Sequence, residues 1–227
     1  MDRKAFLAAF PHTIPVMAGY IFLGFAFGLL VRTNGHPVWL PVLMSVLIFS
    51  GALEFAAVPL LSAPFDPLGG FILGLMISAR HLFYGIPMLR KYKDAGKLKP
   101  LMIFCLTDET FSVSSTVDPP EGVNSTGFYA WIGLLNYIYW NTGTLLGALS
   151  GGLVKFDLRG IDFALTALFI VLFIEQLKTR EGMASGFMGL IITAAVLAIF
   201  GSSSMVLIAM AAILVLLLAG KKVISHD

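Results

Sequence analysis

The stretch from Gly182 to Gly220 reads GMASGFMGLIITAAVLAIFGSSSMVLIAMAAILVLLLAG and contains no Asp, Glu, Lys or Arg in 39 consecutive residues. As one helix it would be about 58 Å long, roughly twice the ~30 Å hydrocarbon core of a bilayer. The stretch is therefore predicted to cross a membrane twice, with a break at 201–204. Residues 127–154 carry no charge over 28 positions and predict another membrane segment.

The composition points the same way. Of 227 residues, 58% are hydrophobic and 12% are charged, whereas a soluble domain carries about 25% charged residues. A net charge of +2 is too small to suggest binding of nucleic acid. The single cysteine, Cys105, can form no internal disulfide. The apolar run 13–31 is longer than the core of a signal peptide, so it is predicted to be a retained first helix.

Apolar segments fall at about 13–31, 38–62, 67–89, 100–117, 127–154, 161–177, 183–200 and 203–220, separated by short breaks rich in Pro, Gly, Asn and Ser. No linker is long enough to separate two soluble domains. The sequence predicts one membrane transport domain over residues 1–227, an all-α polytopic bundle of six to eight membrane segments. Small-residue spacings such as Gly24-x-x-x-Gly28 and Gly143-x-x-x-Gly147 predict closely packed helices.

Two topologies remain open, both with a cytoplasmic N-terminus. If all eight segments cross, the basic loop 90–99 lies outside, which breaks the tendency of Lys and Arg to stay in the cytoplasm. If 38–62 and 127–154 are instead broken, re-entrant segments entering from outside, that loop lies inside and the acidic loop 118–121 lies outside. Ser50-Gly51 in the first segment and Asn136, Asn141 and Gly143 in the second make both segments breakable.

Ionisable residues inside apolar segments cost free energy and therefore indicate function. The five placed there are Glu54, Arg80, His81, Asp108 and Glu109. Arg80 and Asp108 are expected at a similar depth below the surface that bears the basic loop, so they could pair. The pair would either fix helix register or leave Arg80 to bind a carboxylate, which its planar guanidinium fits.

The other polar positions have two interpretations each. His81 and Tyr84 share a helix face, where His81 is either a satisfied hydrogen-bonding residue or a proton carrier. Glu54 either caps a helix or makes a helix-to-helix hydrogen bond, or it faces a cavity and holds an ammonium group or a proton. Asn136, Trp140 and Asn141 are either contacts between helices, an aromatic interface belt, or part of the site. Together these side chains predict a site for a small zwitterion, with no catalytic residue, metal site or cofactor.

Several motifs resemble the AzlC family, the large subunits of bacterial branched-chain amino acid exporters. They are Ser50-Gly51-Ala52-Leu53-Glu54-Phe55, Ser78-Ala79-Arg80-His81-Leu82-Phe83-Tyr84-Gly85, Leu106-Thr107-Asp108-Glu109-Thr110-Phe111, Tyr139-Trp140-Asn141-Thr142-Gly143-Thr144 and Gly160-Ile161-Asp162-Phe163-Ala164. The chain departs from the family pattern at Glu54, where Gln is usual, and at Ser78, where Asn is frequent. The resemblance implies a small membrane partner of the AzlD type.

The expected function is therefore a secondary transporter in the cytoplasmic (inner) membrane. It would export branched-chain amino acids, most simply as a proton antiporter. No Gly-x-x-x-x-Gly-Lys-Ser/Thr loop appears, which argues against ATP use by this chain. The alternatives are a channel, an accessory scaffold, or a membrane-embedded enzyme, and the last lacks the His-Glu-x-x-His zinc pattern.

Overall fold

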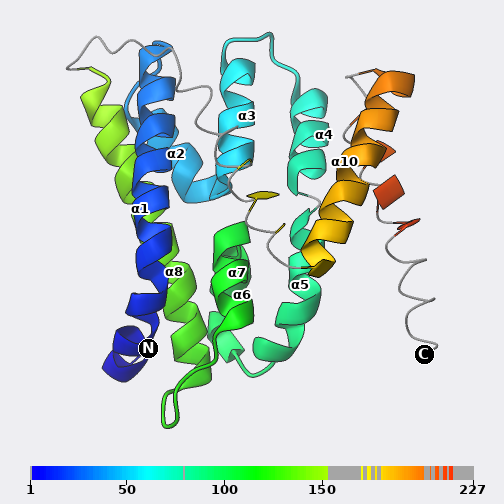
Figure 1. The fold of residues 1–227 in the computed structure, drawn as a ribbon. Coiled ribbons are helices and arrows are strands. Elements are labelled where there is room, and N and C mark those ends of the chain that lie inside the picture. Colours follow the sequence, from blue (N-terminus) through cyan, green and yellow to red (C-terminus); the bar gives the residue numbers. More distant parts are fainter. Residues whose placement is uncertain are drawn as a thin grey trace. The chain divides into compact units, whose positions relative to one another are not determined.

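The computed structural model describes residues 2–78, 80–152, 170, 173–174, 177, 180–201, 205, 208–209, 212–213 and 215–216. Within these ranges every regular element is helical, as predicted (Figure 1). The elements are α1 (Arg3–Thr33), α2 (Trp39–Ile48), α3 (Gly51–Leu61), α4 (Pro67–Ser78), α5 (Arg80–Lys91), a 3-10 turn (Gly96–Leu98), α6 (Lys99–Phe104), α7 (Asp108–Thr116), α8 (Ser125–Ser150) and α10 (Arg180–Phe200). The chain forms two compact units, residues 1–165 and 166–227.

Helices α1 and α8 form the central pair of the first unit and run parallel to each other. Gly24 and Gly28 of α1 face the α8 backbone: a Cβ on Gly24 would lie 2.6 Å from the Trp140 carbonyl oxygen. Gly143 and Gly147 of α8 face α1 in the same way, and a Cβ on Gly143 would lie 2.5 Å from the Ile21 carbonyl oxygen. Two of the predicted small-residue motifs therefore allow the two backbones to touch.

Helices α2 and α3 form a hairpin that enters from the end of the unit where α1 finishes (Figure 1). Arg32 of α1 donates to the carbonyl of His36, just before α2, and Ser62, just after α3, lines a cavity together with Leu30 and Asn34. The helices are broken at Phe49, which adopts a left-handed φ of 44°, and at Ser50, which is extended. The predicted break in segment 38–62 is confirmed.

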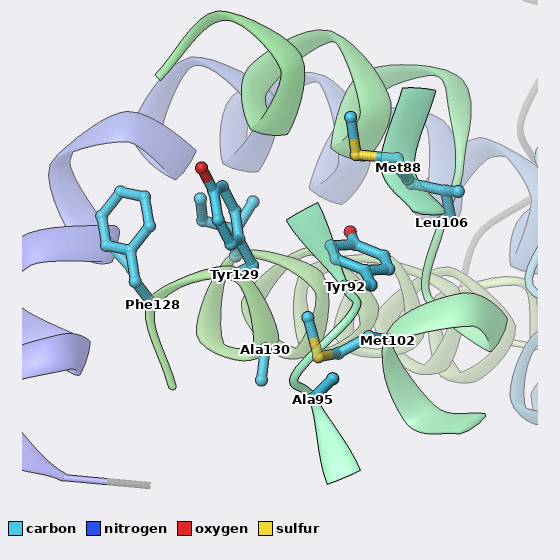
Figure 2. Packing of buried hydrophobic residues seen from close by; sticks show 10 residues of the cluster. Met88, Tyr92, Ala95, Met102, Leu106, Phe128, Tyr129 and Ala130 are labelled. Carbon is cyan, nitrogen blue, oxygen red and sulfur yellow. The ribbon is translucent and has the colours of Figure 1, made fainter. Parts of the chain in front are cut away.

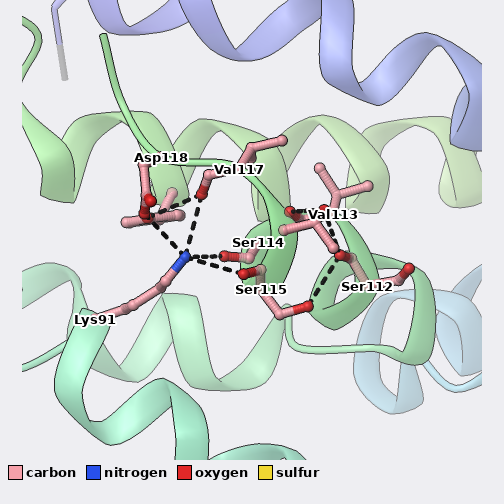
Figure 3. A network of polar contacts seen from close by, with 9 residues as sticks. Lys91, Ser112, Val113, Ser114, Ser115, Val117 and Asp118 are labelled. Atoms are coloured by element: carbon pink, nitrogen blue, oxygen red, sulfur yellow. Dashed lines mark hydrogen bonds and ion pairs between the residues drawn. The ribbon is translucent and has the colours of Figure 1, made fainter. Parts of the chain in front are cut away.

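Helices α6 and α7 form a second hairpin, which enters from the opposite end. Lys91, at the C-terminus of α5 and near the start of α6, donates to the carbonyls of Ser114, Ser115 and Val117 at the end of α7 (Figure 3). The turn between α6 and α7 lies at Cys105–Thr107. Segment 100–117 was predicted as one membrane segment, and the structure divides it in two.

The tips of the two hairpins meet beside α8. The ring of Phe49, at the tip of α2–α3, lies 6.1 Å from that of Phe104 at the tip of α6–α7, and both rings pack against Tyr137. The prediction that 127–154 is broken is wrong: α8 is continuous from Ser125 to Ser150. The polar residues taken as break signals instead contact other helices.

Charge is distributed unevenly between the two ends of this unit. Seven basic residues lie at the end where α1 begins: Arg3, Lys4, Arg90, Lys91, Lys93, Lys97 and Lys99. Arg32 lies at the other end. Asp118 bonds Lys91 at 3.1 Å (Figure 3). The acidic loop is therefore on the same side as the basic loop, which corrects the prediction that the two lie on opposite sides.

An apolar cluster closes the end where α1 begins. Four of its members are almost fully buried (Figure 2): Met88 of α5, Tyr92 just after α5, Met102 of α6 and Phe128 of α8. Elsewhere large apolar side chains point outward, such as Phe22 (66% exposed) and Phe71 (64% exposed), while Thr13, Glu54 and Asn136 are fully buried. Polar groups inside and apolar groups outside are the pattern expected of a protein surrounded by lipid.

By length and composition, α1 is the one helix among the described residues that could span a bilayer unaided. The apolar elements α2 and α3 have 10 and 11 residues, too few to cross alone. The count of six to eight crossings therefore stays a prediction. In the second unit, the described part of which is α10 and scattered single residues, Gly186 packs against Leu177 and Phe173.

Candidate functional site

Glu54, one of the predicted site residues, is fully buried, with no exposed surface. It lies in the first turn of α3, where its Oε1 accepts the backbone N–H of Ser50 at 3.1 Å. The indole Nε1 of Trp140 lies 3.1 Å from each carboxylate oxygen of Glu54. Glu54 therefore ties the tip of the first hairpin to the middle of α8.

Tyr20 of α1 holds the tip of the second hairpin. Its hydroxyl donates to Glu109 Oε2 at 2.5 Å and lies 2.6 Å from Thr107 Oγ1, at the start of α7. Its ring packs edge-to-face against Trp140, with centroids 5.4 Å apart. Tyr20 and Trp140 thus form an aromatic pair, and each member binds an acid from a different hairpin.

The two asparagines of α8 each bond to one hairpin. The Nδ2 of Asn136 donates to Thr110 Oγ1 of α7 at 3.0 Å, and both residues are fully buried. Asn141 accepts from the hydroxyl of Ser45 on α2 at 2.9 Å. Both asparagines therefore make helix-to-helix contacts, one of the interpretations that the sequence left open, and these contacts place them beside the hairpin tips.

The remaining predicted residues lie on α5 and α7. His81 donates through Nδ1 to the carbonyl of Ser78 at 3.1 Å. Asp108 is the first residue of α7. The backbone of α5 includes Arg80 and Tyr84, whose side chains lie outside the described part of the structure, so the pairing of Arg80 with Asp108 stays a prediction.

A cavity of about 420 Å³ opens next to this cluster, between α1 and α3. It is lined by Leu30, Asn34, Phe55, Ala56, Val58, Pro59 and Ser62. None of the predicted site residues lines it, but Phe55 follows Glu54 in the chain. The walls of the cavity are largely apolar.

Two acids, the fully buried Glu54 and the half-buried Glu109, therefore meet two aromatic donors and two helix breaks in the middle of the first unit. Such a place can bind a small charged solute, because broken helices expose backbone N–H and C=O groups inside an apolar surround. Sequence reasoning missed Tyr20, Thr107 and Thr110. Thr107 could have been found as a helix N-cap, since it precedes two acids and its side chain accepts the N–H of Thr110.

Comparison with known proteins gives consistent matches. The AzlC protein family profile matches residues 15–154. The branched-chain amino acid transport protein AzlC of Bacillus subtilis is 44% identical over 210 residues, which is 92% of this chain and 83% of that protein. An uncharacterized membrane protein of Helicobacter pylori is 38% identical over 219 residues, covering 96% of each chain.

A more distant relative is the inner membrane protein YgaZ of Escherichia coli, 25% identical over 190 residues that cover 78% of this chain and 76% of YgaZ. No solved structure matches the chain. The family match covers more than half of the sequence and includes both hairpins, α8 and α1 from residue 15 onward. The chain belongs to the AzlC family.

Proposed function

We propose that this chain is a secondary transporter that exports branched-chain amino acids across the cytoplasmic membrane, driven by the proton gradient and working with a small AzlD-type subunit. The observation that carries the proposal is the meeting of two opposed hairpins at a buried polar cluster beside α8. Half-helices that end near the middle of a membrane are typical of substrate sites in secondary transporters.

The substrate class rests on a relative. The Bacillus subtilis protein, 44% identical over most of both chains, is named a branched-chain amino acid transport protein. The cavity beside Glu54 suits such a solute, because Phe55, Val58 and Leu30 offer apolar walls for an aliphatic side chain. Its volume of about 420 Å³ lies within the range usual for ligand pockets.

The orientation follows from charge. Cytoplasmic loops carry an excess of Lys and Arg. Among the described basic residues at the two ends of the first unit, all but Arg32 lie where α1 begins. That end, with the N-terminus and loop 90–99, is therefore assigned to the cytoplasm. The α2–α3 hairpin and the cavity then open on the outer side, and the α6–α7 hairpin opens on the inner side.

Glu54 is the group we assign to coupling. Its described partners are neutral donors, the indole of Trp140 and the N–H of Ser50. A carboxylate so placed can hold either a proton or the ammonium group of an amino acid. Competition between the two for one site is the simplest physical basis for proton-coupled export. Tyr20 and Glu109 occupy the corresponding position at the tip of the inner hairpin.

The proposal can be tested in living cells. Cells that lack their own exporter are fed leucine-, isoleucine-, valine- or methionine-containing dipeptides, and the free amino acid inside is measured with and without this chain and its small neighbour subunit. Expression should lower the internal level of at least one. Unchanged levels of all four would contradict the export proposal. A fall that persists when the proton gradient is collapsed would favour a channel.

A further inference from the structure

The N-terminus of α3 differs from the other buried or capped helix starts. The side chains of Asp2, Thr107 and Asn124 cap α1, α7 and α8 by accepting a backbone N–H. Ser50 occupies the N-cap position of α3, and serine is among the best N-cap residues, yet its side chain makes no capping bond. The Ser50 hydroxyl oxygen therefore does not accept a hydrogen bond from the N–H groups in the first turn of α3.

The hydroxyl of Ser50 is itself a second and independent sign of a missing ligand. Ser50 is 8% exposed, and its Oγ has no hydrogen-bond partner in the described structure. A buried hydroxyl is normally hydrogen-bonded, because leaving it unsatisfied costs free energy. At this N-terminus, both the hydroxyl donor and the first-turn N–H donors are therefore available to one acceptor.

The surroundings indicate which acceptor would fit. The start of a helix carries a partial positive charge and favours an anion. Glu54, one turn along α3, already bonds the N–H of Ser50, so an added anion needs a positive charge beside it to offset Glu54. An amino acid carries both: its carboxylate and its ammonium group are attached to the same carbon. The indole of Trp140 covers Gly51, where a Cβ would lie 2.7 Å from Trp140 Cη2.

We propose that the N-terminus of α3 is the subsite for the substrate's carboxylate, with the Ser50 hydroxyl and the N–H groups of Gly51 and Ala52 as donors. The ammonium group of the same molecule binds Glu54, and the Trp140 ring moves off Gly51 to admit it. This subsite rests on the proposed function and deepens it. It assigns Ser50, which the sequence analysis treated as part of a helix break, to ligand recognition.

The test compares two ligands that differ at the carboxylate. Leucinamide keeps the ammonium group and side chain of leucine but replaces the carboxylate by a neutral amide. Binding of each to the full chain, purified with its small subunit, is measured for the wild type and for Ser50→Ala. Loss of a hydrogen bond to a charged group should weaken leucine binding about ten- to a hundredfold and leave leucinamide binding unchanged. Ser50→Thr, which keeps the hydroxyl, should restore leucine binding.

Matched variants keep the result interpretable. Ser45→Ala, on the neighbouring helix, removes a buried hydroxyl that bonds Asn141 and should affect both ligands equally. If Ser50→Ala does not fold, Ser50→Gly removes the same hydroxyl while keeping a favourable N-cap residue. Equal weakening of both ligands, or no change for leucine, would overturn the subsite alone. A wild-type protein that binds no branched-chain amino acid would overturn the proposed function as well.

Discussion

A single indole N–H serves both carboxylate oxygens of Glu54: Nε1 of Trp140 lies 3.1 Å from Oε1 and 3.1 Å from Oε2. The bond joins the first turn of a half-helix to the middle of α8, and neither residue is more than 4% exposed. Gly51 leaves room for the indole ring in this position, because a Cβ there would lie 2.7 Å from Trp140 Cη2 and would force the ring to shift. The position of Glu54 thus depends on an aromatic residue 86 positions away in the sequence.

Replacing Trp140 with Phe keeps an aromatic ring but removes the N–H. Because a buried carboxylate then loses a charge-assisted hydrogen bond, we expect the protein to be destabilised by about 1.5–3 kcal/mol and transport to fall at least tenfold. Thermal unfolding and initial transport rates measure the two effects. Trp131→Phe, on the same helix, is the control, since the Trp131 N–H has no hydrogen-bond partner among the described residues. Equal losses in both variants would contradict a special role for Trp140.

Glu54→Gln separates charge from shape. Glutamine can accept the Trp140 N–H through its carbonyl, so the fold should survive with a loss of less than about 1 kcal/mol. If Glu54 carries the proton, the rate of the variant should no longer respond to an imposed pH gradient. Leucine exchange should continue more slowly, because the glutamine carbonyl binds an ammonium group less strongly than a carboxylate does. Counterflow and gradient-driven uptake in proteoliposomes distinguish these modes. A variant that still concentrates leucine against its gradient would remove Glu54 from coupling.

Tyr20→Phe keeps the ring against Trp140 and removes the hydroxyl that bonds Glu109 and Thr107. We expect a severalfold slower rate together with a loss of about 1–3 kcal/mol, since Glu109 and Thr107 each lose one hydrogen bond. Tyr139→Phe is the matched control, because its hydroxyl bonds Thr13 away from the tips. That variant should lose comparable stability but keep its transport rate. Slow transport by Tyr139→Phe together with a normal rate for Tyr20→Phe would contradict a role of the Tyr20 hydroxyl in transport.

The contact between α1 and α8 can be tested by adding one methyl group. Gly28→Ala should destabilise the protein by about 1–3 kcal/mol or more, because the new Cβ would collide with the backbone of Thr144. Gly19→Ala on the same helix has no heavy atom within 4 Å of the new Cβ and should be neutral or slightly stabilising. Melting temperatures of the two variants in detergent give the comparison. Similar values would contradict the close α1–α8 packing.

The sequence predicted the helical class, the break at Ser50-Gly51 and the tight glycine motifs, because each depends on local chemistry. A glycine beside a serine, a favoured N-cap residue, interrupts a helix, and glycines spaced by four place two backbones in contact. The second hairpin was missed because its turn, Cys105–Thr107, contains neither Gly nor Pro. The sequence signal for this turn was the helix-capping residue Thr107 followed by Asp108 and Glu109. The two acids were instead interpreted as buried charges within one continuous membrane segment.

The predicted break in 127–154 failed for the opposite reason. Asn136, Asn141 and Gly143 look like helix breakers in isolation, yet each contacts another helix. Asn136 bonds Thr110, Asn141 bonds Ser45, and Gly143 packs against the backbone of Ile21. Tyr20 carried no signal at all, since a tyrosine in an apolar helix is common and its partners are 87 and 89 residues away. Long-range contacts of this kind depend on the tertiary fold.

The contact between Lys91 and Asp118 predicts a small effect of acid. Hydrogen bonds from Lys91 and Tyr129 lower the pKa of Asp118 below its ordinary value. Because the pKa is lower in the folded state, the ionised carboxylate stabilises the fold at any pH above the pKa of the unfolded state, which is about 4. This stabilisation is lost as the pH falls through the lower pKa of the folded state. Asp118→Asn should therefore make the melting temperature fall less steeply below about pH 4. The effect should be small, because the Asp118 side chain is 83% exposed. Asp94→Asn, in the neighbouring basic loop, is the control.

The central claim is that the substrate passes between the two hairpin tips, where the rings of Phe49 and Phe104 lie 6.1 Å apart. Phe49→Cys and Phe104→Cys, in a chain whose single cysteine is first replaced by Cys105→Ser, can be joined by a short, reducible bifunctional thiol reagent. Leucine transport should stop when the tips are joined and return after reduction, while each single variant treated alike should keep transporting. Undiminished transport by fully cross-linked protein would contradict the account.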